Sequence, residues 1–401
     1  MGLSFALLRM NYQCSLHRLG LTSTPRALCF PKNLLRKYHK HYLPHGECQL
    51  TTQSQTPPLN GAHSLFTAVG DDHRRIRGSL ASGFSDKALR DQSPIIEHHA
   101  SALVSRLRRE LAVNPILDVQ TFFGYAALDA ITDLSYGSPL DGLPHRNTHT
   151  WLARFFLHGK FSTIRMCTCW FWPLDQVLDF IALSLTRKQR ARNWAIFSAK
   201  IEARMEQGDV KRADLMTPVI GKVAEHIEDG PKGRGITKPE LLSHMLASVV
   251  ANSQLTTVAL TSSVYFLLHN ESAMERLLEE IRGAFSSEEA ITVTSTQPLA
   301  YLDAVLNEVL RVHHPTPINL PRVVPREGRT IDGTFVPGNT IVGINLHVIQ
   351  TSPACWVDGL SFHPERFLPS SHRHYDTRFD ADVKAAYMPF STGPRNCIGG
   401  K

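Results

Sequence analysis

The pattern of apolar positions along the chain predicts a mainly helical protein. Apolar residues recur at a spacing near 3.6 over residues 94–111, 122–136 and 299–313, which is typical of packed amphipathic helices. Residues 239–269 form a longer, mostly apolar helical pattern of about 45 Å at 1.5 Å per residue. Polar residues interrupt this pattern, which is not typical of a membrane span: Glu240, Ser243, His244, Asn252, Ser253 and Gln254. We therefore expect residues 239–269 to form a helix that crosses one large domain.

Strands are indicated over a short part of the chain. Residues 330–349 alternate in polarity, and turn signals stand at Asp332-Gly333 and Pro337-Gly338. The predicted fold class is therefore mainly α with a small β-sheet.

Composition and charge narrow the class of protein further. The chain has 401 residues, of which 42% are hydrophobic, so it can bury a large core. The net charge is +7, which suits nucleic acid, anionic lipid or an acidic protein partner. We find no nucleic-acid motif. Seven cysteines at irregular spacings do not indicate a disulfide framework.

A ten-residue stretch near the C-terminus, FSTGPRNCIG over residues 390–399, has the features of a loop that presents a thiolate. Cys397 supplies the sulfur, and Arg395 can pair with a carboxylate in fork geometry. Gly393 permits a tight turn because it has no Cβ. Gly399 leaves room for a flat ring near the backbone, and Phe390 can shield the sulfur from water.

Two further patterns place charged side chains on a shared helix face. Glu308 and Arg311 are three residues apart, and His73 and Arg77 are four apart. Alone, the spacing of Glu308 and Arg311 more commonly marks a surface ion pair, which contributes little to stability. The spacing of His73 and Arg77 alone is equally consistent with a solvated basic helix face and with two donors to one anion. A later PERF segment over residues 364–367 adds Arg366.

The pattern F-x-x-G-x-R-x-C-x-G is matched at every fixed position by residues 390–399, and it resembles the haem-binding loop of cytochrome P-450 enzymes. The resemblance implies one large haem-binding unit in which Cys397 is the axial thiolate ligand of haem b. Such a ligand pushes electron density onto iron and favours O–O cleavage.

The resemblance also assigns the other candidate residues. It implies that Glu308, Arg311 and Arg366 form a buried triad that locks the loop carrying Cys397. It also implies that a basic helix contacts the haem propionates. The family commonly has W-x-x-x-R on this helix, and this chain has His73 and Arg77 at the corresponding positions. The candidate propionate partners are His73, Arg77, Arg322 and Arg395, while Arg74 and Arg75 are candidate contacts for a reductase.

The expected oxygen-side helix departs from the family pattern A/G-G-x-D/E-T-T/S. Residues 251–256 read ANSQLT, so Gln254 replaces the acid and Leu255 replaces the first Thr. An amide cannot titrate as a carboxylate does. Thr256 lies about 100° further round the helix than Leu255, so it is a poor substitute for the first Thr unless the helix shifts. Two alternatives follow. If water alone delivers the protons, the protein can still be a monooxygenase. If it does not activate oxygen in the ordinary way, it is an isomerase, a dehydratase, a peroxide-using enzyme or an inactive remnant.

The resemblance covers residues 60–401 and is of the fungal secondary-metabolism type. We expect residues 1–60 to be an atypical basic segment without the family's anchor. We interpret this segment as a shortened or misread gene end in preference to a targeting segment. We expect residues 61–401 to form the haem domain, without the family's C-terminal helix and hairpin. The implied partners are an NADPH–cytochrome reductase, an apolar small-molecule substrate and a peripheral membrane contact at the endoplasmic reticulum.

Overall fold

The computed structural model describes residues 60–143, 174–208, 212–224, 235–317, 322–331 and 333–400. The expectation of an atypical segment over residues 1–60 therefore falls almost wholly outside the described residues.

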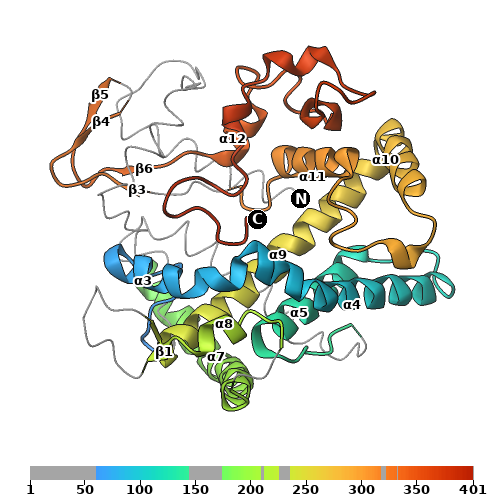
Figure 1. Cartoon of the computed structure of the whole chain (residues 1–401). Coiled ribbons are helices and arrows are strands. Elements are labelled where there is room, and N and C mark those ends of the chain that lie inside the picture. The colour runs from blue at the N-terminus through green and yellow to red at the C-terminus, as the bar shows by residue number, and fades with distance from the viewer. Residues whose placement is uncertain are drawn as a thin grey trace.

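Helices make up most of the described chain (Figure 1). The α-helices are α3 (Gly70–Leu80), α4 (Asp86–Leu111), α5 (Val119–Tyr136), α7 (Leu174–Glu206), α8 (Thr217–Ile220), α9 (Lys238–Leu268), α10 (Glu271–Ala284), α11 (Ala300–Val312) and α12 (Leu346–Thr351). Short 3₁₀ turns occur at Ala81–Phe84, Glu288–Ala290, Pro364–Phe367, Thr377–Ala381 and Lys384–Ala386.

Helix α9 is the central element around which the others pack. It begins with a capping box, in which the Thr237 side chain accepts from the backbone of Glu240 and the Glu240 side chain accepts from the backbone of Thr237. In Figure 1 it runs through the middle of the molecule, with α4 and α5 on one side and α10 and α11 on the other. Its side chains Leu241 and Val249 join the main core with Ile76 of α3 and Leu128 of α5. The sequence correctly predicted this long helix inside the domain.

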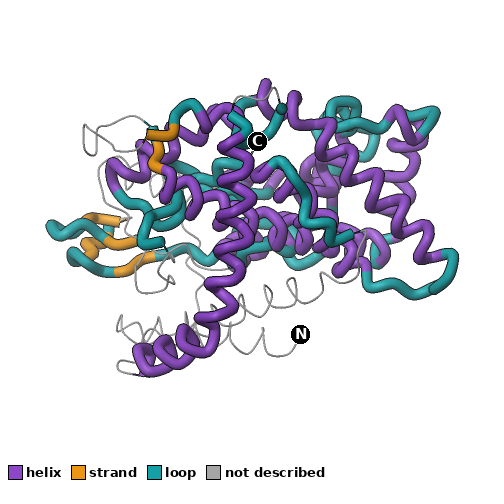
Figure 2. The backbone as a smooth tube through the Cα atoms, turned by 90° about the horizontal axis from the view of Figure 1, so that it is seen from below, coloured by secondary structure: helices purple, strands orange, loops and turns teal. Residues whose placement is uncertain are grey.

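The strands are short and gather toward one side of the helical body (Figure 2). The first pair, β1 (Val223–Ala224) and β2 (Ile236–Thr237), is parallel. Two antiparallel pairs follow, β3 (Arg322–Val323) with β6 (Ile341–Val342) and β4 (Arg329–Ile331) with β5 (Thr334–Val336). The predicted class, mainly α with a small β component, is confirmed.

Two predicted boundaries were wrong because local caps override the apolar pattern. Helix α4 begins at Asp86 rather than at Pro94, since the Ser85 side chain caps it by accepting from the Ala88 N–H. The predicted strand region ends early because the Asn345 side chain accepts from the Val348 N–H and starts helix α12.

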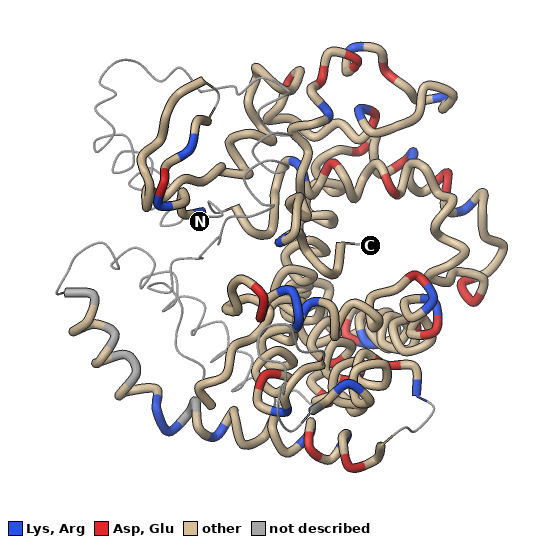
Figure 3. The backbone as a smooth tube through the Cα atoms, turned by 60° about the vertical axis from the view of Figure 1, so that its left-hand side comes forward, with Lys and Arg blue, Asp and Glu red and all other residues tan. Residues whose placement is uncertain are grey.

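Acidic and basic residues are interspersed along the described chain (Figure 3). The seven Lys and Arg of residues 1–46, which hold no Asp or Glu, account for the whole formal charge of +7. Residues 47–401 therefore carry equal numbers of acidic and basic side chains. Within the described ranges, no helix has the length and apolar character needed to cross a bilayer.

Candidate functional site

Residues 390–399, hereafter the Cys loop, fold into a compact turn that places Cys397 at its end. Ser391 has φ of 58° and donates its N–H to Met388 O at 3.0 Å. Gly393 has φ of 84°, which a residue without Cβ adopts at little cost. The Cys397 N–H then donates to Phe390 O at 2.8 Å and closes the turn. Cys397 is exposed, whereas Cys355 is buried.

Helix α3 and the segment before it dock on the Cys loop through two arginines. Arg77 donates from Nη1 to Asn396 O at 2.8 Å and from Nη2 to Asn396 Oδ1 at 2.6 Å. In return, Arg395 of the Cys loop donates to Ala68 O at 2.6 Å. Two of the predicted propionate partners therefore lie where α3 meets the segment that carries Cys397.

His73 completes this cluster as a buried, neutral side chain. Burial, followed by repulsion from Arg395 and Arg77, lowers the pKa of His73 to about 4. At neutral pH its ring can donate one hydrogen bond to an anion but adds no positive charge. Burial also lowers the pKa of Arg77, while the nearby Cys397 acts in the opposite direction. The positive charge of the cluster thus comes from the two guanidinium groups.

The structure corrects one expectation on α3. Arg75 does not present a free cation for a reductase, because its side chain is 5% exposed and donates to Glu240 Oε1 at 2.6 Å. This ion pair joins α3 to the start of α9. Arg74 is 81% exposed and pairs with Asp71.

The remaining predicted cofactor residues lie on the Cys loop and on a strand. Phe390 is 42% exposed and packs beside Gly400, where an added Cβ would lie 3.0 Å from its ring. A Cβ added at Gly399 would meet open space. Arg322 begins β3, in register with Val342 of β6.

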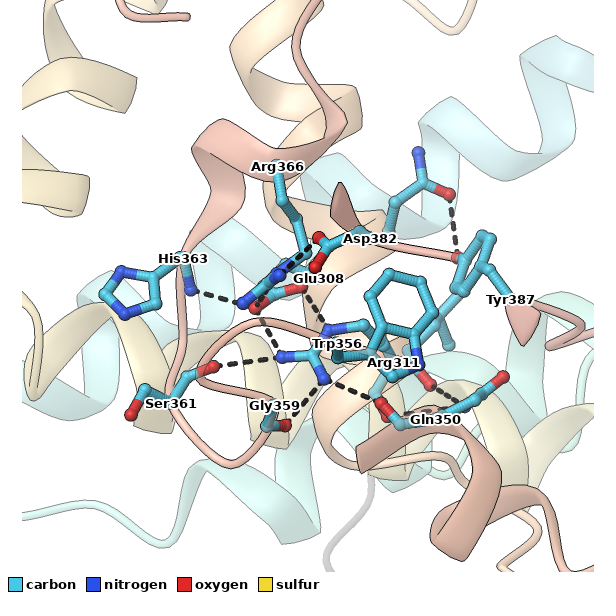
Figure 4. A network of polar contacts seen from close by, with 12 residues as sticks. Glu308, Arg311, Gln350, Trp356, Gly359, Ser361, His363, Arg366, Asp382 and Tyr387 are labelled. Atoms are coloured by element: carbon cyan, nitrogen blue, oxygen red, sulfur yellow. Dashed lines mark hydrogen bonds and ion pairs between the residues drawn. The ribbon is translucent and has the colours of Figure 1, made fainter. Parts of the chain in front are cut away.

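The triad predicted from the sequence is assembled in a fully buried cluster (Figure 4). Arg311 Nε donates to Glu308 Oε2 at 2.7 Å, and Arg366 Nε donates to Glu308 Oε1 at 3.1 Å. All three side chains are 0% exposed. Arg311 also donates to the carbonyls of Gln350 and Gly359, so the cluster fixes the chain that leads toward the Cys loop.

Asp382 is a fourth member of this cluster that sequence reasoning missed. Its Oδ2 lies 2.5 Å from Arg366 Nη1, and its Oδ1 accepts from the Val357 N–H at 2.8 Å. With two carboxylates and two guanidinium groups, the buried charges balance. Trp356 covers the cluster, with Arg311 5.1 Å and Arg366 5.8 Å from its ring centroid. No sequence pattern relates Asp382 to Arg366, because the pairing depends on the tertiary fold.

The predicted oxygen-side residues lie on an unbroken stretch of α9. Leu255 is 40% exposed, Thr256 is exposed and Gln254 is half-buried. The neighbouring hydroxyls of Ser253 and Thr257 are buried and donate to the carbonyls four residues earlier, at 2.7 and 2.6 Å. Those two hydroxyls are therefore engaged with the helix backbone.

A thiol on a compact loop, braced by a buried E-x-x-R cluster in a mainly helical fold, defines the haem-thiolate class of proteins. Comparison with known proteins agrees, since the sequence profile of the family described as Cytochrome P450 matches residues 21–401. The chain belongs to the cytochrome P450 family, which implies a haem iron held by a cysteine thiolate.

Curated relatives are fungal enzymes of about one-third identity. Cytochrome P450 monooxygenase atr2 of Stereocaulon alpinum is 33% identical over 349 residues, covering 86% of this chain and 65% of the relative. Cytochrome P450 monooxygenase aclL of Aspergillus oryzae is 33% identical, covering 86% of this chain and 67% of the relative. Averantin hydroxylase of Dothistroma septosporum is 34% identical, covering 86% of this chain and 62% of the relative. The chain thus spans roughly two-thirds of the length of these relatives.

The residues around Cys397 fit a haem group. The thiol is exposed, the space beside Gly399 is open, and Arg77 and Arg395 supply positive charge for carboxylates. His73 adds a neutral donor.

Proposed function

We propose that Cys397 is the thiolate ligand of haem b and that the protein is a monooxygenase acting on an apolar small molecule. The observation that carries this proposal is the position of the exposed Cys397 beside the junction of Arg77 with the Cys loop. An exposed thiol next to cationic donors suits an anionic, iron-bearing ring.

In this proposal the basic residues hold the propionates. Arg395 and Arg77 act as charged donors, His73 as a neutral donor, and Arg322 contacts the ring from β3. A guanidinium group carries five N–H donors, so Arg77 can keep a bond to Asn396 while it binds a carboxylate. Phe390 and Gly399 line the ring on the sulfur side.

The cofactor supplies dioxygen activation and transfer of one oxygen atom to the substrate. The chain contributes the thiolate, the ring contacts and the α9 residues that manage protons. Gln254 can orient water through its amide but cannot itself release a proton. Leu255 has no hydroxyl and Thr256 lies about 100° further round the helix, so proton supply falls to water.

The relatives support the wider assignment. Two of these fungal proteins are named as monooxygenases, and the third is named as a hydroxylase of averantin. We infer a role in fungal secondary metabolism, with electrons from NADPH through a reductase and with attachment to the endoplasmic reticulum membrane. Their names do not transfer a particular substrate to this chain.

One observation favours a second candidate function. Gln254 and Leu255 remove both the carboxylate and the first hydroxyl from the oxygen-side helix, which suits an isomerase, a dehydratase or a peroxide-using enzyme. A comparison of product formation separates the two functions. The monooxygenase forms product with NADPH, reductase and dioxygen together, whereas product formed with no oxidant, or with peroxide but not with that combination, overturns it.

A further inference from the structure

His314 lies at the point where the chain leaves α11 and turns back along the Cys loop. Helix α11 ends at Val312, and Pro315 follows His314 directly. A residue before proline is restricted to extended backbone, which fixes the direction of its side chain. His314 is 6% exposed, whereas the preceding His313 is exposed. The two neighbouring histidines therefore have different environments.

The ring of His314 bridges two segments with both nitrogens. Nε2 lies 2.8 Å from Pro389 O, while Nδ1 lies 2.8 Å from Thr316 O and 3.0 Å from the Thr316 backbone nitrogen. A carbonyl oxygen accepts only, so Nε2 carries a proton. Nε2 therefore donates to Pro389 O, while Nδ1 faces the backbone of Thr316. The bond to Pro389 joins the end of α11 to the residue before the Cys loop.

The bridge fixes the residue directly before the Cys loop. Pro389 precedes Phe390, whose carbonyl accepts the Cys397 N–H at 2.8 Å. Gln350 joins Met388, the residue before Pro389, to the same end of α11. Its Oε1 accepts the Met388 N–H at 3.3 Å, and its Nε2 donates to Leu310 O at 3.1 Å. The start of the Cys loop is thereby fastened to the end of α11. Its far end is fastened to α3 by Arg77.

We propose that His314 is a positioning residue for the Cys397 sulfur, acting through Pro389 and the Phe390–Cys397 hydrogen bond. This inference rests on the proposed role of Cys397 as the iron ligand. His314 does not touch the iron or the ring. Its imidazole holds the start of the Cys loop so that the sulfur meets the iron in one geometry.

Three single variants of the full chain test this role. His314→Ala removes the bridge, and His314→Gln keeps an N–H donor near the position of Nε2. His313→Ala is the matched control, because the ring of His313 forms a hydrogen bond of 2.8 Å with Ser262 of α9 and none with any residue of the Cys loop that the structure describes. A thermal melt of each variant checks that the fold is retained.

The first measurement is hydrogen exchange in haem-free protein, followed on peptides that span residues 388–399. We expect His314→Ala to speed exchange of the Cys397 amide at least tenfold, with His314→Gln close to the parent and His313→Ala unchanged. Equal exchange in the parent and in His314→Ala overturns the proposal.

The second measurement is the reduced carbon-monoxide spectrum after haem loading. We expect His314→Ala to lose the thiolate form several-fold faster than the parent, and His314→Gln to restore the parent's rate. If the parent takes up no haem, the proposed function fails, while the exchange experiment still decides whether His314 positions the Cys loop. If haem binds and all four proteins keep the thiolate form equally, the function stands and the role of His314 is wrong.

Discussion

Four charged side chains that are buried together set the energetics at the residue scale. Glu308, Arg311, Arg366 and Asp382 balance one another in a region that water does not reach. A buried cluster of this kind contributes little net stability compared with apolar packing, but removal of one member leaves an unpaired charge. The cluster therefore acts mainly to hold the segments that lead into the Cys loop in a single arrangement.

Neutralising Asp382 tests this account. Asp382→Asn keeps the size of the side chain but leaves one positive charge of the buried cluster unbalanced, so we expect the free energy of unfolding to fall by about 3–5 kcal/mol. Urea denaturation measures the change. Glu279→Gln is the control, because Glu279 and Arg373 form an ion pair in which the side chains are 59% and 58% exposed. Such a pair contributes about 1 kcal/mol or less. Equal losses in the two variants would contradict the buried-charge account.

A second prediction concerns His244 of α9, which is buried against Phe66 and Ser248. Burial lowers the pKa of His244 to about 4, below the unfolded value of 6.5. Between these values the unfolded chain binds more protons, so this group makes stability fall as pH drops from 6.5 to 4. His244→Gln should flatten that dependence in unfolding experiments across the window, while His98→Gln on the exposed surface of α4 should leave it unchanged. An unaltered slope in His244→Gln would show that its ring is not held neutral.

Motif spacing predicts some of these residues and not others. Cys397, Arg395, Glu308, Arg311 and Arg366 stand at fixed offsets in the sequence, so a pattern of residue types identifies them. Asp382 and His314 stand in no such pattern. Their roles depend on segments that meet only after folding, which one sequence does not encode as a local signal.

At the scale of elements, the proposed function makes proton supply depend on the composition of α9. A carboxylate can take up and release protons, whereas the amide of Gln254 cannot. We expect the double change Gln254→Glu with Leu255→Thr to raise the share of consumed NADPH that appears as product by about tenfold, which is less than the roughly 100-fold or more that a positioned acid–base group contributes to a rate. Paired assays of NADPH consumption and product formation measure this share.

The control for that experiment is Leu260→Thr, which makes the same type of change at a partly exposed position further along α9. It should leave the coupling unchanged. If the double variant behaves like Leu260→Thr, then the replaced positions do not limit proton supply.

The contact between α3 and the Cys loop yields a further prediction. Arg77→Leu removes two hydrogen bonds to Asn396 and, in the proposed site, a charged donor for a propionate. Bonds of this type contribute about 1.5–3 kcal/mol, so haem should dissociate about 10- to 100-fold faster. Transfer of haem to an excess of an acceptor protein measures the rate. Arg74→Leu, at an 81% exposed position of the same helix, should dissociate at the parent's rate. Equal rates for the two variants would remove Arg77 from the cofactor site.

Element type was predicted more reliably than element limits. The apolar spacing that predicts α5, α9 and α11 reflects the face each helix buries against the core. The start of α4 and the presence of α12 depend instead on single side-chain caps at Ser85 and Asn345. A periodic pattern carries no information about such caps.

At the scale of the whole molecule, the fold class follows from the long apolar helical patterns, and the distribution of charge follows from the sequence alone. Residues 47–401 are electrically balanced, so the net charge does not define a docking face on this part of the chain.

The central claim is that the sulfur of Cys397 binds haem iron as a thiolate. The most direct measurement is the reduced carbon-monoxide spectrum of the full chain produced with excess haem, compared with Cys397→Ser and Cys355→Ser. We expect a strongly red-shifted Soret band from the parent and from Cys355→Ser, and its loss in Cys397→Ser. A parent that stays colourless, or a Cys397→Ser variant that keeps the band, would contradict the account.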